Sequence, residues 1–171
     1  MTWRRRSSRS VVNALMGAAS GLAASWVMER AQAKIMSVGD GETKRREKEA
    51  QDDLEPATVK AAERVATISG TAIPRERMGV ASQAVHYATG AAFGAIFGLF
   101  GRRVSSPILL AGALYGAMVW LFNDEALVPV LGLSRKPWEY PVSTHAKGLA
   151  SHLVYGAATG AGFKLMDKTL H

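Results

Sequence analysis

The sequence predicts an all-α fold, namely an integral-membrane four-helix bundle with one amphipathic surface helix and an interfacial segment before its last helix. Hydrophobic residues make up 48% of the 171 residues, and they gather in four segments, near 10–28, 80–100, 107–122 and 144–165. A membrane-crossing helix needs about 20 mainly apolar residues, so each segment has the approximate length of one. All four segments carry glycines spaced four residues apart: Gly17, Gly21, Gly90, Gly94, Gly98, Gly112, Gly116, Gly156 and Gly160.

The spaced glycines favour a bundle in lipid over a bundle in water. Inside a helix in water, each glycine costs about 1 kcal/mol relative to alanine. In lipid the same residues let helix backbones approach closely, and dispersion forces then hold the helices together. A soluble four-helix bundle would need Leu and Ile at its core positions, and both are scarce in these segments. A homo-oligomer formed through the same glycine faces is a further expectation.

The first segment follows a basic tail at residues 1–9 and forms the first predicted transmembrane helix, at residues 10–28. An arginine cluster beside an apolar run is typical of an anchor on the cytoplasmic side of a membrane. The same pattern, followed by Ala23-Ala24-Ser25, also fits an export signal with a cleavage site. We favour an uncleaved helix, because Gly17 and Gly21 repeat the spacing of the other segments. The arginines of the tail are Arg4, Arg5, Arg6 and Arg9.

Residues 29–79 form a charged connection that is neutral, because ten acidic residues offset ten basic ones. We interpret residues 44–53 as a solvated charge run. A short amphipathic helix is predicted near residues 57–69, with Pro56 at its first position and a stop at Gly70. Its apolar stripe is Ala61, Val65 and Ile68. We expect this helix to lie on the bundle or in the membrane plane.

Residues 80–171 form the membrane domain, and two of its predicted helices share a repeated pattern. Residues 86–94 and 152–160 both read H-x-x-x-G-A-A-x-G. The two helices are separated by two crossings, so they run in the same direction and place His86 and His152 at nearly the same depth. The pattern is consistent with a duplicated helical hairpin, although alanine and glycine are common enough here for coincidence to give the same match.

A polar cluster is predicted where the third helix ends and the fourth begins. Asp124 and Glu125 end the third helix, and His145 begins the fourth, so these residues lie near one membrane face. Between them, "ALVPVLGLSRKPWEYPV" is too short and too rich in proline to span, and reads as an interfacial or re-entrant segment with Trp138 and Tyr140 at the headgroups. The predicted members are Asp124, Glu125, His145, His152, His86 and Tyr155, with Tyr87 nearby.

Three interpretations of this cluster stay open. In the first, the carboxylates are helix-end groups in the headgroup zone and the histidines hydrogen-bond neighbouring helices, so the role is packing or partner binding. In the second, the cluster relays protons or an ion in a small transporter or channel. In the third, the histidines and a carboxylate hold a metal such as zinc or iron in an enzyme, although no tight ligand motif is present. We favour the first, without enzymatic activity.

The formal charge of +7 favours a lipid bilayer over nucleic acid as the partner, because no basic stripe with interleaved aromatic residues accompanies it. Residues 1–9 contribute +4 and residues 80–171 contribute +3. Basic residues near 4–9, 102–103, 164 and 168 favour cytoplasmic termini, whereas the ten in the connection count against this orientation. The chain has no cysteine, which excludes disulfides, zinc–thiolate sites and thiol nucleophiles.

Three stretches resemble the YagU-like family of bacterial inner-membrane proteins: "PATVKAAERVA", "AVHYATGAAFGAIFG" and "WLFNDEALVPVLGLSRKPWEYPVSTHAKGLASHLVYGAATG". The resemblance covers about residues 56–162, and the first predicted helix and residues 36–55 show little of it. It implies a multi-pass inner-membrane protein and supplies no activity, substrate or cofactor. The motif positions are His86, Tyr87, Trp120, Asp124, Glu125, Pro129, Gly132, Leu133, Pro137, Trp138, Tyr140, Pro141, His145, His152, Tyr155 and Gly156. We therefore expect no cofactor other than the metal of the third interpretation, and no small-molecule substrate.

Overall fold

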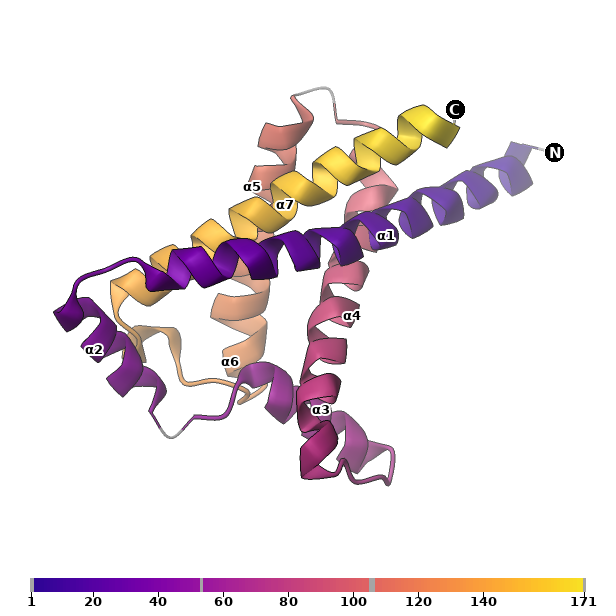
Figure 1. Cartoon of the computed structure of the whole chain (residues 1–171). Helices are drawn as coiled ribbons and strands as arrows, with labels where there is room; N and C mark the ends of the chain where they lie inside the picture. Colours follow the sequence, from indigo (N-terminus) through magenta and orange to yellow (C-terminus); the bar gives the residue numbers. More distant parts are fainter. Residues whose placement is uncertain (1, 53, 105–106, 171) are drawn as a thin grey trace.

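The computed structural model describes residues 2–52, 54–104 and 107–170, and side chains within these ranges from residue 9 to residue 169. Helices make up most of this part of the chain, and it contains no strand (Figure 1). The predicted all-α fold is confirmed. The predicted anchor formed by Arg4, Arg5 and Arg6 lies outside the described side chains.

Four long helices dominate the structure: α1 (Thr2–Ser37), α4 (Arg75–Gly101), α5 (Ile108–Phe122) and α7 (Val142–Leu170). The helix α1 has no break between the predicted tail and the predicted span, and it continues past Met28 because residues 22–38 contain no glycine or proline. It ends before Gly39, whose φ of 118° favours glycine. The segments Arg9–Ser37 and Arg75–Gly101 are long and apolar enough to cross a membrane.

The long helices form two antiparallel pairs, α1 with α4 and α5 with α7, and glycines lie where their backbones come closest. A Cβ added to Gly17 would lie 2.8 Å from the Gly98 Cα, and one added to Gly94 would lie 2.7 Å from the Gly21 Cα. In the second pair, a Cβ on Gly156 would lie 2.7 Å from the Gly116 Cα. Such distances leave no room for a side chain. The remaining predicted glycines face the partner backbone in the same way: Gly90, Gly112 and Gly160.

The two repeated sequences occupy equivalent places in these pairs. Gly94 of α4 lies against the carbonyl oxygen of one α1 residue and against the Cα of Gly21, which comes four residues after that residue. In the other pair, Gly160 of α7 lies against the carbonyl oxygen of Ile108 and the Cα of Gly112, which also comes four residues later. Both α4 and α7 are antiparallel to α1, so they run in the same direction, as the repeat predicts. Figure 1 shows α1 and α7 side by side, with both chain termini at one end.

Glycines and short hydroxyl side chains lie at the contacts between helices, a few large apolar side chains are buried among them, and many other large apolar side chains are exposed. Two compact clusters fill the centre, one of Met16, Phe97 and Phe163 and the other of Ala24, Met28 and Tyr155. Buried hydroxyls donate to the carbonyl four residues earlier in their own helix, which satisfies them locally. These residues are Ser20, Ser25, Ser151 and Thr159.

The charge run is a helix, α2 (Gly41–Gln51), which the sequence interpretation missed. The Asp40 carboxylate accepts a hydrogen bond from the Thr43 N–H, and this helix cap holds the pKa of Asp40 below its ordinary value. Arg45 pairs with Glu42 and Glu49, one turn away in each direction. No residue of α2 is buried, so the run is solvated as expected, and its charges support a helix.

The predicted amphipathic helix is present as α3 (Ala57–Ile68), and Gly70 follows it with a φ of 69°. Its packing face differs from the predicted stripe. Ala62 and Ala66 are buried, whereas Val65 and Ile68 are 64% and 87% exposed. The helix α3 contacts α4, where Thr58 and Ser82 share a hydrogen bond of 2.7 Å. The other end of α3 reaches α6 (Val128–Val130), where Arg64 donates to the Leu131 carbonyl.

Candidate functional site

The two carboxylates predicted to end the third helix lie instead on a π-helical turn, η1 (Asn123–Leu127), which joins α5 to α6 without a break. The Val128 N–H donates to the Asn123 carbonyl, five residues earlier. Pro129 explains the wider turn, because it has no N–H to donate to Glu125 and its ring would crowd the carbonyl of that residue. The extra residue in the turn reorients the side chains that follow it, a feature frequent at functional sites.

Glu125 and His145 form the closest pair in the cluster. Glu125 Oε1 lies 2.6 Å from His145 Nδ1, and His145 Nε2 lies 2.9 Å from the Pro137 carbonyl oxygen. The side chains are only 17% and 24% exposed. A carbonyl oxygen only accepts, so the contact with Pro137 requires a hydrogen on Nε2. In the contact with Glu125, the tautomer decides whether Nδ1 donates or accepts.

Asp124 and His152 form a second, looser pair two turns further along α7. Asp124 Oδ2 lies 3.6 Å from His152 Nδ1, while the same nitrogen lies 3.0 Å from the Gly148 carbonyl oxygen. The Asn123 amide donates to Asp124 Oδ1 at 2.8 Å. His152 thus donates to its own helix and faces Asp124 without a direct hydrogen bond, which leaves Asp124 an acceptor for a further group.

The other two predicted members form no hydrogen bond or ion pair with these four among the described residues, although the Tyr155 ring lies edge-on to the His152 ring at 6.5 Å. Tyr155 is 3% exposed and donates to the Gly90 carbonyl at 2.6 Å, so its hydroxyl joins α7 to α4. His86 Nε2 is buried and has no hydrogen-bond partner among the described residues. No hydrogen bond or ion pair in the described part of the chain joins His86 to the two pairs. The neighbouring Tyr87 donates to Glu29 of α1 at 2.9 Å, together with Gln83 at 3.1 Å.

A buried ion pair beside the cluster was missed by the sequence interpretation. Lys147, 8% exposed, donates to Glu47 of α2 at 2.6 Å and to the Met36 carbonyl at 3.4 Å. The hydrogen bond from Lys147 lowers the pKa of Glu47. The pair joins residues 100 positions apart, so local spacing could not reveal it. The one available signal was a lysine on a face of the fourth segment that also carries Ser151 and His152.

A metal at the cluster has little support in the arrangement of the donors. No group of three or more His, Asp or Glu residues among those described is arranged to hold a metal ion. Glu125 and His145 use their facing atoms on each other, and His152 Nδ1 faces a backbone carbonyl. The arrangement instead places two carboxylate–histidine pairs at the end of the bundle where α1 ends and α7 begins.

The fold and site together define an all-helical protein, with two helices apolar enough to cross a membrane and two carboxylate–histidine pairs at one end. Residues 63–160 match the model of a family described as "Protein of unknown function (DUF1440)". The match covers more than half of the chain, which therefore belongs to this family. It includes all six predicted cluster residues and excludes α1 and α2. No curated protein and no solved structure matches the chain.

Proposed function

We propose that the chain is a multi-pass protein of the bacterial inner membrane, with four spans and a non-enzymatic role in helix packing and partner binding. The observation that carries the proposal is the exposure of many large apolar side chains along α1, α4 and α5, whereas glycines and buried Ser and Thr lie at the contacts between the helices. Length and composition alone also fit the core helix of a soluble protein. Such a helix would be mostly buried, whereas only 28% of the apolar window of α4 is.

The outer face of α5 supports the proposal most directly. Along this helix Gly112, Gly116 and Val119 are buried, and the opposite side exposes a row of large apolar side chains. Soluble monomers rarely expose a contiguous apolar patch larger than a few hundred Å². The exposed side chains are Leu109, Leu110, Leu114, Met118, Leu121 and Phe122. The helical run 108–130 is about 34 Å long at 1.5 Å per residue, enough to cross the roughly 30 Å hydrocarbon core.

The close backbone contacts fit the packing of helices in lipid, where glycine faces and short hydroxyl side chains replace a leucine core. Because the nine glycines contact partner helices within one chain, a partner helix or a second copy would bind the exposed leucine face of α5. We therefore propose the leucine face of α5 as the surface for self-association, in place of the glycine faces expected from the sequence.

The charge distribution supports cytoplasmic termini. The whole formal charge of +7 comes from residues 1–9, Arg102, Arg103 and the last turns of α7, which share one end of the bundle. The opposite end carries many charges that cancel. Basic residues in short loops and near the ends of membrane helices are retained on the cytoplasmic side, and the basic residues of the connection 38–74 count against this orientation.

The proposal predicts that a cysteine at Leu114 is protected by lipid. In permeabilised membranes, so that both aqueous sides are accessible, Leu114→Cys should react with a charged maleimide at least tenfold more slowly than Lys48→Cys on exposed α2. Detergent should remove the difference. The chain has no native cysteine, so the labelling reports one position. Equal labelling before detergent would mean that the outer face of α5 is in water.

A second candidate function, proton or ion handling, is favoured by the short Glu125–His145 contact. The Glu125–His145 contact, the acceptor at Asp124 and the buried His86 Nε2, which has no hydrogen-bond partner among the described residues, supply ionisable groups inside the bundle. Ionisable groups at such positions commonly belong to proton or ion pathways.

This candidate predicts that Glu125→Gln slows flux without unfolding the protein. In proteoliposomes containing a pH-sensitive dye, with a potassium gradient and valinomycin as the driving force, the variant should conduct protons at least tenfold more slowly than the native chain. Glu139→Gln, an exposed carboxyl group in the preceding segment, is the matched control and should leave the flux unchanged. If the native chain conducts no faster than empty vesicles, the packing role stands alone.

A further inference from the structure

We propose that the pocket between the end of α4, the start of α5 and the last turns of α7 binds the phosphate group of a membrane glycerophospholipid. The inference rests on the membrane location proposed above and adds a ligand class to it. The pocket has a volume of about 350 Å³. Among the described residues, Val104, Ile108 and Phe163 give it an apolar side, and Arg102, Lys164 and Asp167 give it a charged side.

The apolar side of the pocket is rigid. Phe163 is 1% exposed and packs with Phe97 and Met16 in the central cluster. Gly101 lets the α4 backbone come close to it, since an added Cβ would lie 2.8 Å from Phe163 Cε1. The adjoining surface of α5 exposes Leu109. A lipid whose acyl chain lies along this surface would therefore have its headgroup at the pocket.

The charged side retains one net positive charge. Arg102 pairs with Asp167 across the pocket, and these side chains are 30% and 28% exposed. Arg103 donates a hydrogen bond to the Leu99 carbonyl and so stabilises the end of α4. Lys164 is exposed, and no carboxylate of the described residues forms an ion pair with it. A phosphodiester carries a single negative charge, which would neutralise the single net positive charge of the pocket.

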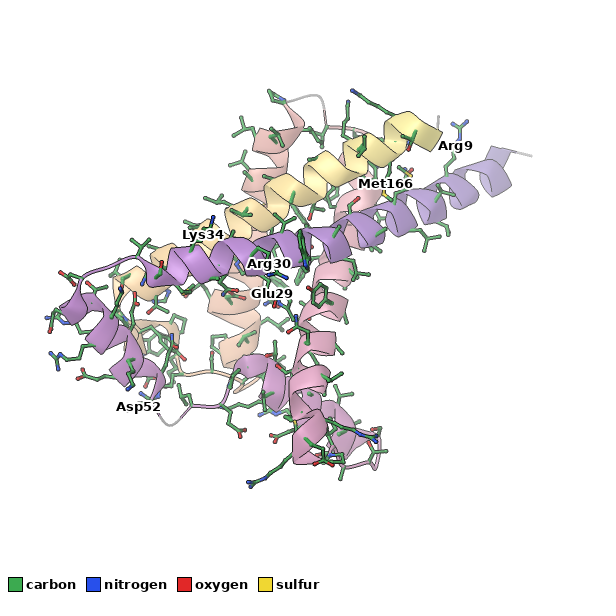
Figure 2. All side chains as sticks on the ribbon, in the orientation of Figure 1. Arg9, Glu29, Arg30, Lys34, Asp52 and Met166 are labelled. Atoms are coloured by element: carbon green, nitrogen blue, oxygen red, sulfur yellow. The ribbon has the colours of Figure 1, made fainter. Side chains whose placement is uncertain are left out.

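The position of the pocket corresponds to the headgroup layer in the proposed topology. It lies where α4 ends at Gly101 and α5 begins at Ile108, at the end of the bundle that carries the net charge of the chain. Figure 2 shows Arg9 and Met166 at this end, distant from Asp52 of α2. Basic pockets between helices on the cytoplasmic side bind lipid headgroups in membrane proteins. The first N–H groups of α5 also lack a side-chain cap, so they favour an anion at this site.

The test is a lipid titration of the delipidated protein, followed by native mass spectrometry. Dioleoylphosphatidylglycerol should bind with a defined stoichiometry, and Lys164→Ala should weaken it about fivefold, as expected for one basic side chain near a lipid surface. Lys168→Ala, an exposed lysine on the same helix outside the pocket, is the matched control and should change the dissociation constant less than twofold. Both lysines are exposed, so neither variant threatens the fold.

Two further ligands identify the source of the recognised group. Dioleoylglycerol, which has the same chains without a phosphate, should not bind at this site. Inorganic phosphate at millimolar concentration should not displace the lipid, and displacement would make the pocket a site for a soluble anion and overturn the inference. Equal weakening by both lysine variants would also overturn it. Alkaline extraction separates this failure from failure of the proposed function, because a chain released from membranes would contradict the membrane location itself.

Discussion

Gly94→Leu is expected to prevent the native packing of α1 against α4. The added side chain would meet the Gly21 Cα at 2.7 Å and the carbonyl of Gly17, and neither backbone atom can move without shifting the whole helix. Overpacking against side chains already costs about 1–3 kcal/mol. Contact with backbone on both sides exceeds that range, so we expect little or no monodisperse protein after extraction in mild detergent, measured by size-exclusion chromatography.

Gly79→Leu is the control for this substitution. Gly79 lies in the same helix, and nothing lies within 4 Å of a Cβ added there. The two variants share the change in composition and helix propensity, and differ only in what the side chain meets. Gly79→Leu should therefore give the same elution profile as the native chain. Identical behaviour of both leucine variants would show that α1 and α4 do not meet through glycine.

Lys147→Met is expected to detach α2 from the bundle. The substitution leaves Glu47, whose side chain is 14% exposed, without its cation. Removal of one partner of a buried ion pair typically costs about 3–5 kcal/mol, because the remaining charge is uncompensated. The double variant Lys147→Met/Glu47→Leu removes both charges and should recover most of the loss. Thermal unfolding and protease cleavage within residues 41–51 measure the two effects.

The same pair gives the docking of α2 a dependence on pH. The pKa of Glu47 is lowered in the folded chain by the hydrogen bond from Lys147. The pair therefore contributes its full stability above the ordinary glutamate value of 4.5, and this contribution is lost as the pH falls through the lowered value. Protease cleavage of α2 should rise in the native chain as the pH decreases below that range. In the double variant the rise should be smaller, because only the Asp40 cap and the Glu42 ion pairs of α2 still titrate over the same interval.

The sequence predicts the parts of this fold that depend on local pattern. The glycine spacing identifies the four long helices, and Gly70 correctly marks the end of α3. The sequence analysis placed Asp124, Glu125 and His145 near one another, because the carboxylates precede the last helix and His145 begins it, but it predicted one cluster of six residues and no pairs. The structure adds two hydrogen-bonding geometries, and whether the pairs have a function stays a prediction.

The missed features depend on long-range packing. The π turn follows from Pro129 acting four residues upstream on Glu125, so apolar periodicity alone gave a helix end at Phe122. The location of Tyr155 depends on how closely α7 approaches α4, which places its hydroxyl against Gly90. The exposed face of α3 has the same origin, since the packing of the whole fold buries Ala62 and Ala66 and leaves Val65 and Ile68 exposed. Prediction of the Lys147–Glu47 pair would have required the position of α2, and the sequence interpretation assigned no helix to that segment.

The placement of α1 has a consequence for the order of assembly during synthesis. It contacts both α4 and α7, so it completes its packing only after the last helix has been made. In the membrane topology proposed above, its buried serines would face lipid until then. Ser20 and Ser25 donate to the carbonyls of Met16 and Gly21 in α1 itself, so their hydroxyls are satisfied before any partner helix is present. In that topology α1 can therefore insert alone, before α4 and α7 have been made.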